Sequence, residues 1–322
     1  MSNLFSNIEA RTRLAGTNKL EILLFSLGLD AQTGRRETFG INVFKVREVM
    51  RTPEITAAPE MPDCVEGMVS LRGTLVPVVD LAKYVGVKSD APRGIMIVTE
   101  YNGHTQGFLV EAVDTILRLD WSQMRVPPEM LTARMGGLVT AITELGDGRL
   151  VMMLDVEKVL AETANYEEGL LFDGIEPIED GRLVVFADDS AVARGQIERT
   201  LNVLGIPFIS AINGRRAIEE LQKIATHAAT TNRSVRDLVS VILTDVEMPE
   251  MDGYILTKTI KSDSRFAGIP VIMHSSLSGM SNQTLGKSVG VDEYVSKFEP
   301  QRLAATLRRM IAESRPAQAG AK

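Results

Sequence analysis

The alternation of hydrophobic and polar residues changes in kind near residue 160. Before that point, short β-rich runs are separated by turn-forming residues about every 8–12 positions, a spacing typical of β-sandwiches and barrels. The pattern predicts strands over Glu21–Leu29, Phe39–Phe44, Met68–Arg72, Thr74–Val79, Ile95–Tyr101, Gly107–Val113 and Leu150–Leu154. The first half is therefore expected to be all-β, as one barrel or a pair of small barrels.

Glycine-containing turns and a few helical patterns complete the first half. Asn102-Gly103 separates two predicted strands and is a strong hairpin signal, and Gly146-Asp147-Gly148 predicts a second hairpin. Helical patterns are confined to Ser6–Leu14, Lys45–Met50 and a segment that begins at Asp155. Helices should thus be few and short in this half.

An acidic stretch rich in chain breakers lies between the two halves. Between Lys158 and Arg182 there is no Lys or Arg, whereas seven Asp and Glu residues fall there. Such a composition predicts a linker over 161–181, and its simplest interpretation is a solvated spacer. The expected organisation is an N-terminal arm (1–17), a β domain (18–160), the linker, a second domain (182–314) and a disordered tail (315–322).

The second half alternates strand and helix patterns. Predicted strands are Leu183–Ala187, Pro207–Ile212, Leu238–Thr244, Ile269–His274 and Glu293–Ser296. Predicted helices are Ala191–Leu204, Gly214–Ala229, Gly253–Asp263, Gly279–Val289 and Gln301–Ser314. Five such units predict a doubly wound α/β domain with a parallel five-stranded sheet, whose ligand site lies at the carboxyl ends of the strands. The polar stretch Thr226–Asp237 is expected to be a mobile surface loop.

Composition narrows the class of protein without deciding the fold. The chain has 322 residues, a net charge of −7, and hydrophobic and charged contents of 44% and 24%. The acidic balance argues against a nucleic-acid partner, which needs clustered Lys and Arg. One cysteine and three histidines exclude an intramolecular disulfide and make a structural zinc site very unfavourable. Without a signal-peptide pattern or a membrane-spanning apolar run, a cytoplasmic protein with no direct membrane insertion is expected.

Polar residues follow consecutive strands of the predicted parallel sheet. Asp188 and Asp189 follow the first strand, Asp245 follows the third, Ser275 the fourth and Lys297 the fifth. Because neighbouring strands end at the same edge, the three carboxylates should converge, and their repulsion calls for a hard cation such as Mg²⁺. The Ser275 hydroxyl and the Lys297 ammonium could then hold two phosphoryl oxygens. A single Asp after a strand is usually a helix cap, but five such groups together predict a phosphoryl site.

These residues resemble the signature of two-component receiver domains, which are flavodoxin-like. The matching blocks are FADD at 186–189, TDVEMPEMDG at 244–253, HSS at 274–276 and YVSKF at 294–298. The resemblance covers about 183–312, with the blocks in order and at the family's spacing. It implies that Asp245 accepts a phosphoryl group from a phosphohistidine of a histidine kinase.

The resemblance also implies a Mg²⁺ site. Its ligands would be the carboxylates of Asp188, Asp189 and Asp245 and the backbone carbonyl of Glu247. The Glu247 side chain departs from the family's pattern, because side chains at that position face the phosphoryl group and a carboxylate there could repel or misplace the attacking water. Slow autodephosphorylation is therefore expected.

Two further roles follow from the receiver resemblance. Ser275 and Lys297 would contact the phosphoryl group, and Ser275 with Tyr294 would form the family's switch pair. A second departure is Phe298, which follows Lys297 where the family usually has proline. The conformation of that loop therefore does not follow from the resemblance.

The first half resembles CheW-type chemotaxis coupling domains over about 18–160. The matching blocks are FGINVFKVREVM at 39–50, EGMVSLRGTLVPVVDLAKYVG at 66–86, GFLVEAVDTILRL at 107–119 and LGDGRLVMMLDVEKVL at 145–160. The family fold is two intertwined five-stranded barrels around a shared core. The resemblance implies docking to chemoreceptor cytoplasmic tips and to the chemotaxis histidine kinase.

By position, Val46, Glu48 and Arg72 match residues linked to contact with the receptor or kinase. Two of them have a plainer alternative. Arg72 could form a structural salt bridge with Glu66 or Asp80, and Val46 could simply pack in the core.

A CheW-like domain followed by a receiver resembles the CheV-type chemotaxis adaptors over essentially the whole chain. This resemblance implies a non-enzymatic adaptor, located at receptor arrays by association, that couples chemoreceptors to the kinase under control of Asp245 phosphorylation. One alternative is a phosphate sink that drains phosphoryl groups from the kinase. Another, a Mg²⁺-dependent phosphatase or phosphotransferase, needs an acid–base group near Asp245 and is disfavoured.

Overall fold

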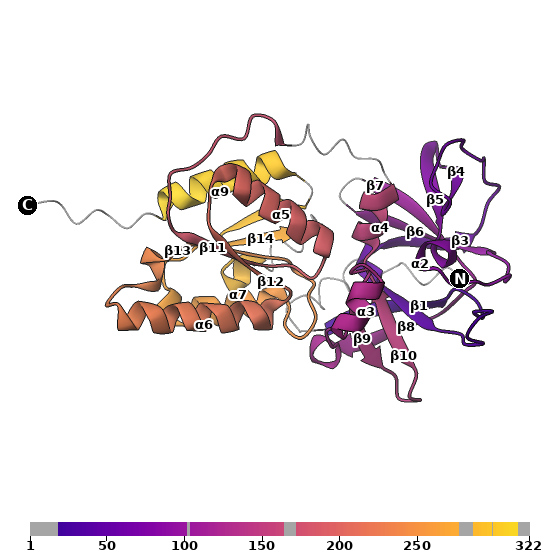
Figure 1. The fold of residues 1–322 in the computed structure, drawn as a ribbon, viewed down its shortest axis with the longest axis horizontal. Helices are drawn as coiled ribbons and strands as arrows, with labels where there is room; N and C mark the ends of the chain where they lie inside the picture. The colour runs from indigo at the N-terminus through magenta and orange to yellow at the C-terminus, as the bar shows by residue number, and fades with distance from the viewer. Residues whose placement is uncertain (1–18, 102–103, 164–171, 277–285, 298, 315–322) are drawn as a thin grey trace, which may run out of the picture. The chain divides into compact units, whose positions relative to one another are not determined.

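The computed structural model describes residues 19–101, 104–163, 172–276, 286–297 and 299–314. These residues form two compact units, one within Lys19–Asn165 and the other within Tyr166–Lys322. Figure 1 shows that strands make up most of the first unit and that helices flank a central sheet in the second. None of the described helices is both long and apolar enough to cross a membrane.

The first unit contains two five-stranded sheets. One has the order β8-β1-β2-β10-β9, from β1 (Lys19–Ser26), β2 (Thr38–Asn42), β8 (Ala112–Asp120), β9 (Val139–Glu144) and β10 (Leu150–Leu154). The other has the order β3-β6-β7-β5-β4, from β3 (Val46–Arg51), β4 (Val65–Leu71), β5 (Thr74–Asp80), β6 (Ile95–Tyr101) and β7 (His104–Val110). Neighbouring strands are antiparallel except for β2–β10 and β5–β7. The predicted all-β architecture is confirmed.

A hydrophobic core joins the two sheets of this unit. Phe25 and Ile41 from one sheet and Val79 and Phe108 from the other lie in the same buried cluster. The alternation along each strand sends these side chains inward, so that burying one sheet face buries the other as well. The short helices are η1 (Val43–Lys45), α2 (Leu81–Val85), η2 (Trp121–Gln123), α3 (Glu129–Arg134) and α4 (Val156–Thr163).

One predicted helix of the first unit is wrong. Within the segment Lys45–Met50, only Lys45 is helical, as the last residue of η1; the rest is extended, because β3 pairs with β6, with Val49 opposite Ile97. Short apolar runs do not separate helix from strand by periodicity, and here the ladder to β6 decides. Strand β4 also begins at Val65, earlier than predicted, while the helix expected over Ser6–Leu14 lies outside the described residues.

The second unit has a parallel sheet of order β12-β11-β13-β14-β15. Its strands are β11 (Leu183–Ala187), β12 (Phe208–Ala211), β13 (Val239–Thr244), β14 (Val271–Ser275) and β15 (Glu293–Ser296). Its helical segments are α5 (Ala191–Leu204), α6 (Gly214–Thr230), η4 (Val235–Asp237), α7 (Gly253–Ser262), η5 (Ser264–Phe266) and α9 (Pro300–Glu313). Side chains of α6 and α7 pack in one core cluster and those of α5 and α9 in another, so that both sheet faces are covered. The predicted doubly wound fold is confirmed.

Two segments expected to be loosely attached are structured. Much of the polar stretch Thr226–Asp237 belongs to α6 and to the turn η4, and Val235 is buried. In the predicted linker, Ile175 and Ile178 pack against the cluster of α5 and α9, and the Ile178 amide donates to the Leu204 carbonyl at 2.8 Å. Ile175 and Ile178 thus attach the stretch 172–180 to the second unit, while the side chains of Asp173, Glu176 and Glu179 stay exposed.

Candidate functional site: a buried carboxylate–lysine cluster

The site in the second unit begins at the carboxyl ends of two adjacent strands. Ala187 of β11 is in register with Thr244 of β13, so that the residues after each strand are neighbours. The Asp245 amide donates to the Ala187 carbonyl at 2.8 Å and continues the ladder by one residue. Oxygens of Asp188, Asp189 and Asp245 consequently lie within 4.8 Å of one another. The predicted convergence of the three carboxylates is present.

Backbone amides orient two of these carboxylates. Asp188 is 0% exposed and Asp245 is 4% exposed. Oδ1 of Asp188 accepts from the Ser190 amide at 2.9 Å, and Oδ1 of Asp245 accepts from the Val246 amide at 2.6 Å. Hydrogen bonds of this kind favour the ionised form and leave the second oxygen of each group for another partner.

Lys297 supplies that partner. It follows β15, its side chain is 1% exposed, and its Nζ lies 2.9 Å from Oδ2 of both Asp188 and Asp245. A buried ammonium is stable only when charges and hydrogen bonds compensate its desolvation, and two carboxylates do so here. The pairing brings the ends of β11, β13 and β15 together.

Ser275 is the last residue of β14, the strand between β13 and β15, and its side chain is buried. Its carbonyl accepts from the Lys297 amide at 3.2 Å. The predicted residues Asp188, Asp189, Asp245 and Lys297 are thus joined by direct contacts or short separations, with Ser275 attached through the backbone. Phe298 lies outside the described residues.

Gly253 is a site residue that sequence reasoning did not single out, although it ends the quoted block at 244–253. A Cβ there would lie 1.9 Å from the Asp245 carbonyl oxygen. Its amide donates to the Val246 carbonyl at 2.9 Å. Only glycine allows α7 to begin so close to the backbone of Asp245.

Tyr294 on β15 is half-buried, and its hydroxyl bonds to the hydroxyl of Tyr254 on α7 at 3.2 Å. Burial raises the pKa of Tyr294 to about 12. Sequence reasoning missed Tyr254, which is 2% exposed. The available signal was a tyrosine on the apolar face of a helix, since a buried phenol needs a polar partner.

The charge of the site favours a cation. Three carboxylates and one ammonium leave a formal charge of −2 in a mostly buried cluster. Mg²⁺ prefers oxygen ligands and typically takes a few carboxylates together with water and phosphate oxygens. The donor set therefore fits that ion.

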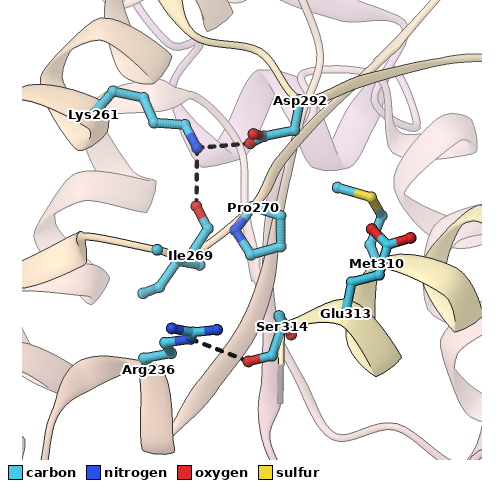
Figure 2. Close-up of a pocket in the computed structure, with 9 residues that line it drawn as sticks. Arg236, Lys261, Ile269, Pro270, Asp292, Met310, Glu313 and Ser314 are labelled. Carbon is cyan, nitrogen blue, oxygen red and sulfur yellow. Dashed lines mark hydrogen bonds and ion pairs between the residues drawn. The ribbon is translucent and has the colours of Figure 1, made fainter. Parts of the chain in front are cut away.

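A hollow in this unit lies at the ends of the strands opposite to the acidic cluster. Figure 2 shows Arg236, Lys261, Pro270, Asp292 and Ser314 around it. Nζ of Lys261 donates to the Ile269 carbonyl at 3.0 Å and to Asp292 at 2.6 Å, and Nε of Arg236 donates to the Ser314 carbonyl at 3.1 Å. Because these cations already bond to protein oxygens, they hold neighbouring segments of the second unit together, and the hollow is not part of the acidic site.

In the first unit, Arg72 and Glu48 meet on the surface. Nη2 of Arg72 lies 2.9 Å from Oε2 of Glu48, and the Arg72 side chain is 71% exposed. The expected alternative partners are wrong, because Glu66 pairs with Lys83 and Asp80 pairs with Arg93.

Arg72 also has an unusual backbone. It occupies the β4–β5 turn with φ of 51°, and Gly73 follows with φ of 86°. Two successive positive φ values are typical of a type I′ hairpin turn, in which a long side chain is strained. Val46, by contrast, is 3% exposed in the core shared by the two sheets, as its plainer alternative had it.

Comparisons with known proteins agree with this division of the chain. The CheW-like domain model matches residues 22–164, and the response regulator receiver domain model matches residues 184–308. Chemotaxis protein CheV1 of Helicobacter pylori is 27% identical over 331 residues, covering 97% of this chain and 99% of the relative. Chemotaxis protein CheV3 of the same organism is 28% identical over 301 residues, covering 91% of this chain and 95% of that protein. The chain is a CheV-type protein.

The CheW-like half is also similar to a free-standing relative. Chemotaxis protein CheW of Klebsiella aerogenes is 32% identical over 168 residues, which is 51% of this chain and 93% of that protein. The chain is thus a chemotaxis protein of an adaptor family, with a CheW-like domain and a receiver domain that carries the acidic cluster of Asp188, Asp189 and Asp245.

Proposed function

We propose that this CheV-type protein couples chemoreceptors to the chemotaxis histidine kinase and that phosphorylation of Asp245 tunes the coupling. The observation that carries the proposal is the buried cluster of Asp188, Asp245 and Lys297 on a chain that also holds a CheW-like domain. A phosphoryl site without a coupling domain would suit a receiver that acts alone. Because this chain carries the site and a CheW-like domain together, the phosphoryl group is suited to regulate the coupling activity of that domain.

The chemistry at Asp245 is transfer of a phosphoryl group. Oδ2 of Asp245 would attack phosphorus, the P–N bond of the phosphohistidine would break, and the departing nitrogen would keep the electron pair of that bond, while the other ring nitrogen carries the single proton of the neutral imidazole. Lys297 would keep its ammonium close to the new acyl phosphate, since its Nζ is already 2.9 Å from Oδ2. Ser275, after the neighbouring strand, would donate its hydroxyl to a phosphoryl oxygen.

Mg²⁺ would be held by the carboxylates of Asp188, Asp189 and Asp245 and by the Glu247 carbonyl. When bound, it supplies positive charge that offsets the negative charge of the phosphoryl oxygens. The −2 charge of the cluster supports this assignment. Beyond its own phosphotransfer and autodephosphorylation, no catalysis is proposed for the chain.

In the CheW-like domain we assign partner contact to Glu48 and Arg72, where the strained and exposed turn supports it. The partners would be chemoreceptor cytoplasmic tips and the kinase, which implies a cytoplasmic location at receptor arrays. Val46 would act indirectly, by fixing the start of β3 from within the core.

The test measures phosphotransfer and coupling on the same variants. Radiolabelled kinase should transfer its phosphoryl group to the native chain and to Asp263→Ala, a control for an aspartate away from the cluster, but not to Asp245→Ala. Receptor-controlled kinase activity should then respond differently to adapting stimuli with Asp245→Ala than with the native protein. If Asp245→Ala accepts no label yet couples as the native protein does, the proposal that phosphorylation regulates coupling is wrong, and the phosphate-sink alternative is favoured. If it labels as well as the native chain, the phosphoacceptor is wrong.

A further inference from the structure

The ring of Tyr294 lies in a closely fitting seat. On one side, a Cβ added to Gly286 would lie 2.4 Å from both Cε2 and the hydroxyl oxygen of Tyr294, so that this glycine provides space for the ring. Gly286 is buried and is helical, as are the residues up to 289. A side chain at this position would have to displace the tyrosine.

The other side of the seat is Tyr254. Its hydroxyl is 3.2 Å from that of Tyr294, and its ring packs in a cluster with Val246, Met273 and Val291 against which Tyr294 also packs. Val246 follows Asp245 directly, and Met273 precedes the strand end at Ser275. The seat is therefore continuous with the elements that carry the phosphoryl site.

Tyr254 is more than a space-filling residue of α7. Phenylalanine or leucine would fill the same apolar position, whereas burying a hydroxyl is costly unless it is bonded. In the bond between the two rings, the Tyr254 hydroxyl oxygen accepts from the Tyr294 hydroxyl, and burial, the neighbouring Tyr294 and the carboxylate of Glu247 raise the pKa of Tyr254 above its ordinary value. Its hydroxyl thus has a defined task at Tyr294.

We propose that Tyr254 is a positioning residue that, with Gly286, holds the Tyr294 ring inward before Asp245 is phosphorylated. This deepens the proposed function and rests on it only in naming Tyr294 as part of the switch. With the ring already seated, phosphorylation does not need to recruit it. The change of state then begins at Lys297 and Ser275, which flank Asp245, rather than at the ring.

Nitration of tyrosines in the full chain, mapped by peptide mass spectrometry, tests the seat without a kinase or phosphoryl donor. Tetranitromethane reacts with phenolates, so Tyr294 should react slowly in the native protein. Tyr254→Phe keeps the ring packing but removes the hydroxyl, and Gly286→Ala keeps the hydroxyl but blocks the space. Both should release the ring and so raise the nitration rate of Tyr294 by about tenfold or more, because burial is what raises its pKa to about 12 and a fall towards 10 increases the phenolate fraction by up to about a hundredfold. Loss of the Tyr254 hydrogen bond from a ring that stays buried would act the other way, since that bond lowers the pKa of Tyr294.

The matched control is Tyr84→Phe, which removes a tyrosine hydroxyl bonded to Glu162 in the CheW-like domain. It should leave Tyr294 unchanged. Unfolding midpoints of all variants separate release of the ring from general loosening. If Tyr294 in a folded Tyr254→Phe protein reacts as slowly as in the native protein, the positioning role is overturned.

A second arm adds Mg²⁺ and beryllofluoride, a phosphoryl mimic, to the native protein. The nitration rate of Tyr294 should stay the same, and a clear fall would show that the ring is recruited rather than already seated. Failure to bind the mimic, seen as an unchanged unfolding midpoint, would count against the phosphoryl site and leave the seat intact. The two ideas thus fail by different measurements.

Discussion

The ammonium group of Lys297 lies 2.9 Å from Oδ2 of Asp245, and both side chains are almost fully buried. The same nitrogen is 2.9 Å from Asp188, so that one cation links the ends of three strands. In the absence of a bound metal, the fold depends on this lysine to offset the repulsion between the carboxylates.

Replacing Lys297 by methionine should therefore destabilise the receiver domain. Two buried carboxylates would lose their counter-charge, and breaking a buried pair in this way typically costs about 3–5 kcal/mol. Urea unfolding of the full chain at pH 7, followed by circular dichroism with EDTA present, measures the loss. Added Mg²⁺ should recover more stability in this variant than in the native protein, because the ion replaces the missing charge.

Lys258→Met is the control for the loss of a lysine. Lys258 lies on α7 and is exposed, so that its replacement should change stability by no more than about 0.5 kcal/mol. Equal unfolding midpoints for Lys297→Met and the native protein in EDTA would contradict the proposed balance of charge.

Glu247→Asn should shorten the lifetime of phosphorylated Asp245. A carboxylate two residues from the acyl phosphate repels or misplaces the attacking water, whereas an amide can hydrogen-bond to it. Decay of label from the isolated phosphoprotein measures the half-life. Glu250→Asn, in the same loop at a φ of 64° that asparagine tolerates, is the matched control and should decay as the native protein does. Equal half-lives for all three proteins would sink the idea.

The pair of Arg72 and Glu48 can be tested by exchanging its charges. An exposed ion pair contributes only about 0–1 kcal/mol to stability, so that Arg72→Glu, Glu48→Arg and the double variant should all fold. If the pair contacts a receptor or the kinase, pull-down of those partners should be weakened in both single variants and in the double variant. Recovery of binding in the double variant would indicate instead that the ion pair only stabilises the turn.

Arg308 on α9 should hold the segment 172–180 in place. Its guanidinium donates to the Glu176 carbonyl at 2.5 Å and to the Pro177 carbonyl at 3.4 Å. Arg308→Ala should speed hydrogen exchange at the Ile178 amide, which bonds to Leu204, and should speed proteolysis within this segment. Arg302→Ala, on the same helix and paired with Glu299, should change neither. Unchanged exchange in Arg308→Ala would mean that the apolar contacts of Ile175 and Ile178 suffice.

The sequence alone predicted the parallel sheet and the cluster at its edge because both depend on local pattern. Continuous apolar runs identify buried parallel strands, and topology places their ends together. Asp188 and Asp245 could thus be assigned to one site before the structure was known. The order of the two domains was readable for the same reason, since each has sequence blocks of its own.

Contacts between residues far apart in the chain needed the tertiary structure. The segment expected as a helix over Lys45–Met50 is strand β3, because its ladder with β6 outweighs a short and ambiguous pattern. The acidic composition of 161–181 suggested a spacer, yet Ile175 and Ile178 bury their side chains on the second unit. Composition averages over a segment, whereas two well-placed apolar side chains are enough to dock it.

The phosphoryl site shows the same division. Residue type and spacing determined that Asp245 and Lys297 would each follow a strand of the same parallel sheet, because strand ends are encoded locally. Only the folded sheet decided that one ammonium lies between Asp188 and Asp245, and that Tyr254 bonds to Tyr294 from forty residues away. Side-chain direction and burial depend on packing between elements, and the order of residues along the chain does not contain that geometry in a form that can be read one segment at a time.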